Sequence, residues 1–123
     1  MPKKILIVDD EPNIVISLEY LMKKEGFEVA VATDGDAALA MAASFRPDLM
    51  LLDVMMPKKS GFEVCELLRA DASFGELKIV MLTAKGRDTE IAKGTGLGAD
   101  AYITKPFSTK ELVARIRAML DIQ

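Results

Sequence analysis

Histidine and tryptophan are absent from this 123-residue sequence, and cysteine occurs only once. Without histidine, the chain cannot build a Ser-His-Asp or Cys-His nucleophile system, a histidine-ligated zinc site or a histidine general base. A single cysteine cannot form an intramolecular disulfide or a cysteine-clustered metal site, which favours a reducing compartment. The sequence therefore excludes several common kinds of catalytic and metal chemistry.

A basic surplus and long apolar runs are also missing. The chain carries 16 Lys plus Arg against 19 Asp plus Glu, whereas a nucleic-acid-binding module normally carries a basic patch. No apolar run approaches the ~20 residues that cross a bilayer. The short run Ile5–Val8 after Met1-Pro2-Lys3-Lys4 is too brief for a signal peptide. We expect one soluble cytoplasmic domain, residues 1–123, that contacts neither nucleic acid nor membrane.

Short apolar runs recur along the chain. Ile5–Val8, Leu49–Leu52 and Ile79–Leu82 are continuous rather than alternating, which is typical of strands buried on both faces of a parallel sheet. Val29–Ala32 and Ala101–Thr104 are weaker candidates. The sequence thus predicts five strands.

Segments with the apolar spacing of helices separate these strands. The apolar stripes run over Val15–Met22, Ala37–Ala43, Phe62–Leu68 and Leu112–Leu120. Ser108 with Glu111 three residues later is a capping-box pattern, and Pro12 suits a first helical turn. These signals predict a helix after four of the five strands.

A further helix, at about Arg87–Thr95, has the weakest pattern. Gly94, Gly96 and Gly98 would each cost about 1 kcal/mol relative to Ala inside a helix. We interpret them as a loop after a helix that ends near Lys93, and a loosely held element that can shift is the alternative. With this helix, strand and helix alternate five times, which predicts an α/β fold with a doubly wound parallel sheet covered by helices on both faces.

Polar residues stand where the apolar runs stop. The first run ends in Asp9-Asp10-Glu11, and the third, fourth and fifth end in Asp53, Thr83 and Lys105. In an open parallel sheet these ends lie along one edge, where such folds bind ligands. Each residue alone also has a structural explanation, as a helix cap, a turn residue or a solvated charge.

The combination points to phosphoryl chemistry. Two carboxylates ~4 Å apart repel by about 4 kcal/mol at an effective dielectric constant near 20, so three at one edge require a cation or a shared proton. Oxygen ligands without His or Cys favour Mg²⁺ or Mn²⁺. A metal and a lysine can neutralise phosphoryl oxygens while an aspartate oxygen attacks in line.

These motifs resemble a known family. The segments Ile5–Glu11, Leu51–Pro57, Met81–Ala84 and Tyr102–Phe107 are similar to the receiver domain of two-component response regulators, which take part in phosphorelay signalling. The resemblance runs from about Lys3 to Leu120. It implies a flavodoxin-like, CheY-like fold with five helices and a five-stranded sheet in the order 2-1-3-4-5.

The resemblance implies that Asp53 is the phosphoacceptor. Its donor would be the phosphohistidine of a sensor histidine kinase or a histidine phosphotransfer protein, and that donor is another protein because this chain has no histidine. Asp10 and Asp53 would bind Mg²⁺ directly, with Mn²⁺ as the alternative metal. Asp9 would bind it through water, and the main-chain carbonyl of Met55 would complete the protein ligands.

The resemblance also implies a switch. Lys105, joined to Pro106 by a cis peptide bond, would pair with phosphoryl oxygens. Thr83 resembles the hydroxyl that moves to the phosphoryl group, and Tyr102 resembles the aromatic residue that turns inward behind it. Because phosphorylation adds a charge of about −1.5 to −2, it favours the state in which Thr83 and Lys105 close on Asp53.

The implied consequence is a rearranged face made by residues 87–95, 101–104 and 108–120. A downstream output protein or an attached effector domain would recognise this face. We expect a monomer that forms a homodimer through the face when phosphorylated, as in relatives with a similar segment 108–120. Ala101 departs from those relatives, which usually have a second acidic residue after Asp100, so the charged network of that dimer would be incomplete.

Other positions carry less information. Met55 and Lys85 lie two residues after Asp53 and Thr83, where the family tunes the lifetime of the acyl phosphate. Cys65 lies on an apolar stripe and is interpreted as an inert core residue. Lys58-Lys59-Ser60 is interpreted as a solvated loop rather than a binding patch.

Three other functions compete with this one. A magnesium-dependent phosphatase with an aspartyl nucleophile needs a second carboxylate where this chain has Met55. A flavin- or nucleotide-binding protein needs a Gly/Ser/Thr-rich loop where Asp9-Asp10-Glu11 would repel phosphate. A degenerate receiver would act as a phosphate-independent interaction module, yet this chain retains the functional positions. We expect no enzyme activity beyond the domain's own phosphorylation and dephosphorylation.

Overall fold

The computed structural model describes residues 2–54, 56, 58–84 and 98–122. The strands are β1 (Lys4–Val8), β2 (Glu28–Ala32), β3 (Leu49–Asp53), β4 (Lys78–Ala84) and β5 (Ala101–Lys105). The helices are α1 (Pro12–Lys24), α2 (Gly35–Phe45), α3 (Gly61–Arg69), the short 3₁₀ helix η1 (Ala72–Phe74) and α5 (Thr109–Met119). The helix expected at about 87–95 lies outside the described residues, as do Met55 and Lys85.

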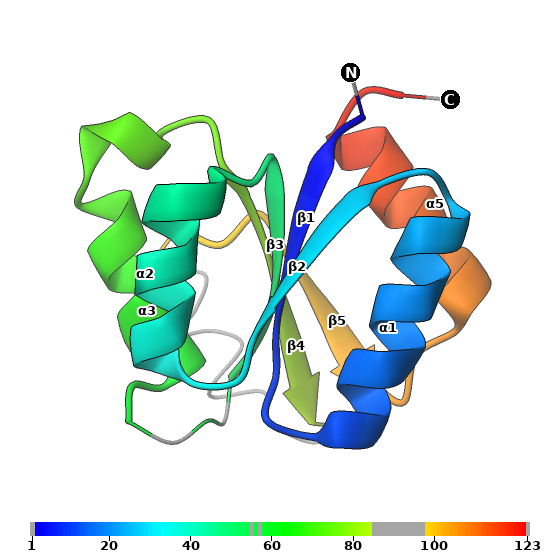
Figure 1. The fold of residues 1–123 in the computed structure, drawn as a ribbon, viewed down its shortest axis with the longest axis horizontal. Helices are drawn as coiled ribbons and strands as arrows, with labels where there is room; N and C mark the ends of the chain where they lie inside the picture. The colour runs from blue at the N-terminus through cyan, green and yellow to red at the C-terminus, as the bar shows by residue number, and fades with distance from the viewer. Residues whose placement is uncertain (1, 55, 57, 85–97, 123) are drawn as a thin grey trace.

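All strand pairs are parallel, and the sheet order is β2-β1-β3-β4-β5. Helices α1 and α5 cover one face of the sheet, and α2 and α3 cover the other (Figure 1). The carboxyl ends of the strands therefore share one edge, and both ends of the chain lie at the opposite edge (Figure 1). The α/β class and the strand order 2-1-3-4-5 are confirmed.

The continuous apolar runs are strands buried on both faces. Ile5 and Ile7 of β1 belong to the core beneath α1 and α5, whereas Leu6 and Val8 belong to the core beneath α2 and α3. Each such side chain contributes about 1.5–3 kcal/mol when it is fully buried. This two-sided burial explains why the strand pattern does not alternate.

Local signals fix where the helices begin. Pro12 occupies the first turn of α1, where its missing N–H has no helical partner to lose. The Ser108 hydroxyl accepts a hydrogen bond from the Glu111 N–H (3.3 Å) at the start of α5. Ser60 and Glu63 form a complete capping box at the start of α3. The helices therefore start directly after the loops that leave the carboxyl edge of the sheet.

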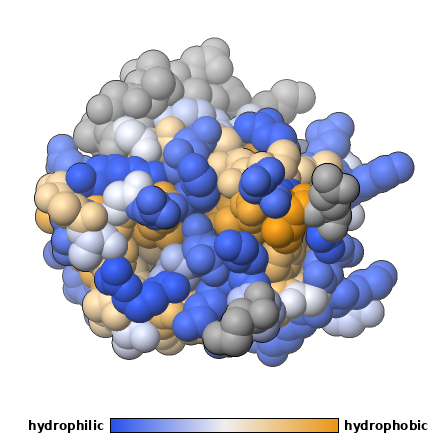
Figure 2. Space-filling model, turned by 90° about the horizontal axis from the view of Figure 1, so that it is seen from above, coloured by the Kyte–Doolittle hydropathy of each residue, from blue (hydrophilic) through white to orange (hydrophobic). Residues whose placement is uncertain are grey.

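The edge opposite these loops has a mixed surface. Figure 2 views this edge and shows hydrophilic side chains interspersed with apolar ones. Within the described part of the chain, no helix is both long and apolar enough to cross a membrane. The distinctive polar chemistry lies at the carboxyl edge instead.

Candidate functional site

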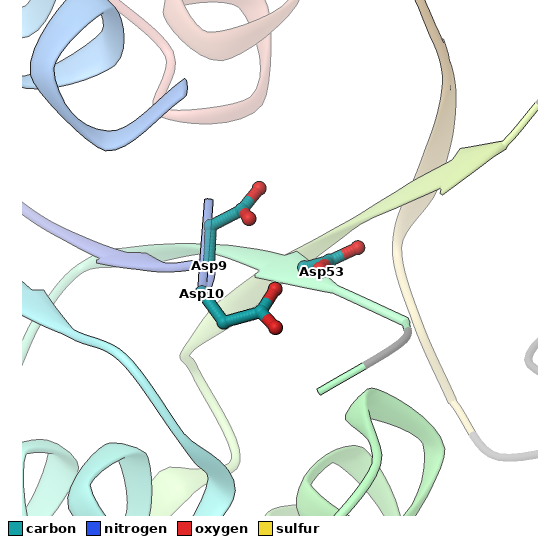
Figure 3. A group of neighbouring side chains, drawn as sticks. All are labelled: Asp9, Asp10 and Asp53. Carbon is teal, nitrogen blue, oxygen red and sulfur yellow. The ribbon is translucent and has the colours of Figure 1, made fainter. Parts of the chain in front are cut away.

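Three carboxylates meet at the carboxyl ends of β1 and β3. Asp9 and Asp10 follow β1, and Asp53 is the last residue of β3. One oxygen of each carboxylate lies within 4.8 Å of the other two, and Figure 3 shows the side chains extending from the adjoining strand ends. Asp9 is fully buried, Asp53 is 7% exposed, and Asp10 is exposed. The structure thus brings together the carboxylates that the strand ends predicted.

The register of the sheet explains this meeting. Val8 pairs with Leu52, so the residues that follow them, Asp9 and Asp53, are neighbours at the edge. The Asp9 N–H donates to the carbonyl of Ala32 (3.2 Å), which continues the backbone pairing beyond β1. The backbone pairing therefore places Asp9 and Asp53 side by side.

Lys105, at the end of β5, points its ammonium group into the acidic cluster. Its Nζ lies 2.9 Å from Asp9 Oδ2, 3.4 Å from Asp53 Oδ1 and 3.9 Å from Glu11 Oε1. Burial lowers the pKa of Lys105, but the hydrogen bond to Asp9 and the charges of Asp53, Asp9 and Glu11 outweigh burial and raise this pKa above its ordinary value. Lys105 is therefore a firmly charged cation. The peptide bond that follows it, to Pro106, is cis.

Asp9 uses both of its oxygens inside the protein. Oδ2 accepts from Lys105, and Oδ1 accepts a hydrogen bond from the Glu11 N–H (2.9 Å). A buried carboxylate is stable only when it is paired and hydrogen-bonded. These two bonds explain how a fully buried acid fits between the strands.

Two buried hydroxyl groups of β4 and β5 have no hydrogen-bond partner among the residues that the structure describes. The Thr83 Oγ1 and the Tyr102 OH are buried, and neither has a hydrogen-bond partner within the described part of the chain. Asp53 pairs with Leu82 across β3 and β4, so Thr83 stands one position beyond the residue opposite Asp53. An unsatisfied buried hydroxyl costs about 1–3 kcal/mol. Thr83 therefore offers a hydrogen-bonding group to a ligand at this edge.

Tyr102 also borders a groove of about 600 Å³ between β5 and α5. The residues that line the groove include Tyr102, Ile103, Pro106, Phe107, Leu112 and Arg115. It forms part of the face that the resemblance assigns to partner recognition. The rest of that face, residues 87–95, lies outside the described residues.

The carboxylate cluster fits a small divalent cation. All the candidate side-chain ligands are oxygens, which Mg²⁺ and Mn²⁺ prefer, and three of them come within 4.8 Å of one another. A phosphate-binding protein would need donors after β1, but Asp9, Asp10 and Glu11 stand there. The cluster therefore suits a cation and, with it, an anionic phosphoryl group beside Lys105.

Other sequence-based interpretations fare differently. Cys65 is fully buried in the core beneath α2 and α3, as its stripe position predicted, and burial raises the pKa of its thiol. Lys58, in the segment interpreted as a solvated loop, is 61% exposed, and Lys58 and Lys59 also form surface ion pairs with Asp34 (3.8 Å) and Asp36 (3.2 Å). The sequence did not reveal these pairs, since the partners belong to another loop.

Gly61 is a site residue that sequence reasoning missed. A side chain there would overlap the main-chain oxygen of Asp53 and lie 2.9 Å from the Val54 Cα. The Gly61 N–H also donates to the Val54 carbonyl (2.9 Å). A glycine directly after the Ser60 cap was the available signal.

Comparison with known proteins agrees with this geometry. Residues 5–117 match the sequence model of the response regulator receiver domain. The DNA-binding response regulator MtrA of Mycolicibacterium smegmatis is 48% identical over 98% of this chain and 51% of its own length. The chain thus spans about half the length of this relative.

Two solved structures extend the comparison. Chemotaxis protein CheY4 of Vibrio cholerae superimposes with a TM-score of 0.90 at 31% identity, over 97% of this chain and 99% of that one. The receiver domain of the sensor histidine kinase PA1611 of Pseudomonas aeruginosa, which has a magnesium ion in its active-site cleft, has a TM-score of 0.90 at 26% identity. That likeness covers 98% of this chain and 99% of the other.

Proposed function

This chain belongs to the response regulator receiver domain family, and on that premise we propose that it accepts a phosphoryl group on Asp53 to control an output partner. The supporting observation is the nearly buried Asp53 carboxylate, held in one cluster with Asp9, Asp10 and the ammonium of Lys105. Among the described residues, these three aspartates are the group of acidic side chains whose oxygens come close enough to hold one metal ion.

The proposed reaction transfers one phosphoryl group. An oxygen of the ionised Asp53 attacks phosphorus in line, a P–O bond forms, and the P–N bond of a phosphohistidine breaks. The imidazole leaves with the bonding electrons and takes up a proton. Because these 123 residues contain no histidine, the phosphohistidine lies outside them, and we propose that a histidine kinase or a histidine phosphotransfer protein supplies it.

Asp9, Asp10 and Asp53 would hold Mg²⁺, or Mn²⁺ as the alternative, and the main-chain oxygen of Met55 would complete the protein ligands. The bound ion supplies positive charge that offsets the phosphoryl oxygens. Both Asp9 oxygens already accept hydrogen bonds, Oδ2 from the Lys105 ammonium and Oδ1 from the Glu11 N–H. This supports the proposal that Asp9 binds the metal ion through a water molecule rather than directly. Asp10 is exposed and accessible to the ion.

Lys105 and Thr83 would recognise the phosphoryl group. The Lys105 ammonium lies 3.4 Å from Asp53 Oδ1, so a small shift brings it to an oxygen of a phosphorylated Asp53. The Thr83 hydroxyl, which lacks a partner within the described residues, would donate to another phosphoryl oxygen. Both contacts exist only after phosphorylation, and they therefore favour a second conformation.

Tyr102 would carry this change to the partner-binding face. Its OH is buried without a partner in the described ranges, and Tyr102 is one of the residues that line the groove between β5 and α5. When Thr83 moves toward Asp53, space opens for Tyr102 to turn inward, which reshapes that groove. We propose that an output protein or an attached effector domain recognises the new shape, either by itself or through a homodimer. The relative MtrA is named a DNA-binding regulator.

Acetyl phosphate with Mg²⁺ tests the proposal. Intact-mass measurement should show one added phosphate, lost in Asp53→Asn and retained in Asp71→Asn, a matched change at an exposed aspartate. Labelling of Asp53→Asn at the wild-type level would refute the assignment. Absence of labelling in the wild type, with every kinase and donor supplied, would favour a phosphate-independent interaction module.

A further inference from the structure

At Gly35, the first residue of α2, a neighbouring loop leaves no room for a side chain, whereas the backbone conformation does not itself require glycine. Within the described residues, only Gly26 and Gly98 among the glycines have positive φ, so Gly35 uses a conformation open to any residue. A side chain at Gly35 would overlap the Cβ and the main-chain oxygen of Lys59 and lie 2.9 Å from its carbonyl carbon. The start of α2 is therefore in direct backbone contact with the loop between β3 and α3.

That loop is closed at its base beside Asp53. Gly61 ends the loop, and its N–H donates to the carbonyl of Val54 (2.9 Å), while its Cα sits against the Asp53 carbonyl. The chain thus leaves Asp53 and returns to it within a short span. Lys59 of this loop lies against Gly35.

Charges reinforce the same contact. Lys59 Nζ lies 3.2 Å from Asp36 Oδ1, and Lys58 Nζ lies 3.8 Å from Asp34 Oδ2. Asp34 is held in place because it also caps α2 by accepting from the Ala37 N–H (2.8 Å). Exposed pairs of this kind contribute about 0–1 kcal/mol each, so they orient the loop more than they stabilise the fold.

The loop also carries a strained residue. Lys58 has φ of 69°, a left-handed conformation that costs a non-glycine residue about 1–2 kcal/mol. Such a conformation persists only where the surroundings impose it. In this conformation Lys58 pairs with Asp34, the cap of α2, and Lys59 pairs with Asp36 in its first turn.

We propose that the start of α2 is a clamp that positions the loop after Asp53, with Gly35 as the contact point and the Asp36–Lys59 pair as its guide. This inference rests on the proposed metal site, because the loop begins at Asp53 and contains position 55. Gly35 and Asp36 are not among the carboxylates proposed to hold the metal or the groups proposed to bind the phosphoryl oxygens. They are positioning residues, and they act through the loop.

A purely structural role makes a different prediction. Alanine is a better helix former than glycine by about 1 kcal/mol, so Gly35→Ala would stabilise α2 if space were available. The clamp instead requires Gly35→Ala to push the loop away from α2. If Gly35 matters only for helix stability, Gly35→Ala should leave the loop position and the metal affinity unchanged. If Gly35 positions the loop, both should change.

The first experiment compares Gly35→Ala with Gly75→Ala. At Gly75 a side chain would meet only the Ala72 carbonyl, at 3.3 Å. Calorimetric titration with Mg²⁺ should show affinity weakened by about tenfold or more in Gly35→Ala, the range typical of groups that orient metal ligands. Gly75→Ala should bind Mg²⁺ like the wild type.

Amide hydrogen exchange gives a readout without metal. The Gly61 N–H, bonded to Val54, should lose protection in Gly35→Ala, whereas the Asp9 N–H, bonded to Ala32, should keep it. Wild-type Mg²⁺ affinity together with unchanged Gly61 protection would overturn the clamp. Protection measured this way tests the clamp even if the wild type binds no Mg²⁺, which would count against the proposed metal site alone.

A second pair of variants covers the case in which Gly35→Ala does not fold. Lys59→Glu places two negative charges where the Asp36–Lys59 pair stood, so the clamp predicts weaker Mg²⁺ binding and a less protected Gly61 N–H. Simple electrostatics predicts tighter Mg²⁺ binding, because the change adds negative charge near the cluster. The double variant Asp36→Lys with Lys59→Glu should restore the wild-type values. Tighter binding in Lys59→Glu, or no recovery in the double variant, would overturn the proposal.

Discussion

Lys105 lies closer to Asp9 than to Asp53, at 2.9 Å against 3.4 Å. Asp9 is fully buried, and the lysine is therefore its counter-ion as well as a neighbour of the proposed phosphoacceptor. One cation thus lies between these two carboxylates, with Glu11 at 3.9 Å as a third neighbour.

Lys105→Ala should destabilise the protein. Removal of one partner of a buried ion pair leaves an uncompensated charge, and we expect the free energy of unfolding to fall by about 3 kcal/mol. Urea titration without metal measures this, with Lys110→Ala on the exposed side of α5 as the control. An unchanged midpoint would mean that the Asp9–Lys105 pair does not stabilise the fold.

The same variant should separate phosphorylation from switching. Lys105→Ala retains Asp53 and should still take some phosphate from acetyl phosphate, but it lacks the ammonium that closes on the phosphoryl group. NMR signals of the groove residues Tyr102 and Phe107 should then stay in their unphosphorylated positions. A wild-type shift of these signals on phosphorylation would contradict the coupling role of Lys105.

Mg²⁺ should raise the thermal stability of the protein. A ligand that binds only the folded state adds about 2.7 kcal/mol at a concentration one hundred times its Kd. Asp10→Ala should abolish this gain, and without metal it should melt slightly higher because one repelling carboxylate is gone. Differential scanning fluorimetry measures both effects, and Asp121→Ala, at an exposed site, is the control. A full Mg²⁺ effect in Asp10→Ala would exclude this residue as a ligand.

Thr83→Val should not destabilise the unmodified protein. The Thr83 hydroxyl is buried without a partner in the described residues, so an apolar group of the same shape should raise the free energy of unfolding by about 1 kcal/mol. Phosphorylation of Asp53 should proceed, whereas the response of the β5–α5 groove should be lost. Thr104→Val, at an exposed position of β5, serves as the control. A marked loss of stability would show that the Thr83 hydroxyl already has a partner.

Cys65 should be unreactive in the folded protein. It is fully buried, and burial raises the pKa of its thiol, so little thiolate is present at neutral pH. A thiol-specific chromogenic reagent at pH 8 should therefore react only as fast as the protein unfolds, and at once in denaturant. Rapid reaction under native conditions would show that the thiol is accessible.

Much of this protein could be predicted from local sequence patterns. The runs Ile5–Val8 and Leu49–Leu52 are buried on both faces, as continuous apolar runs require. The parallel sheet then brings the residues that end these runs to one edge, which is why Asp9, Asp10 and Asp53 could be placed together. The order of the strands came from the resemblance to a family, because apolar periodicity does not state which strands are neighbours.

Only the tertiary structure decided how distant segments touch. Lys58 and Lys59 read as a solvated loop, yet they pair with Asp34 and Asp36 of a segment more than twenty residues away. The residues around Gly35 in the sequence give no sign that the backbone of Lys59 lies beside it. The burial of the Thr83 hydroxyl away from any partner in the described part of the chain, and the closer approach of Lys105 to Asp9, are likewise outcomes of packing. Short-range periodicity determines elements and the residues at their ends, whereas contacts between loops depend on the three-dimensional path of the whole chain.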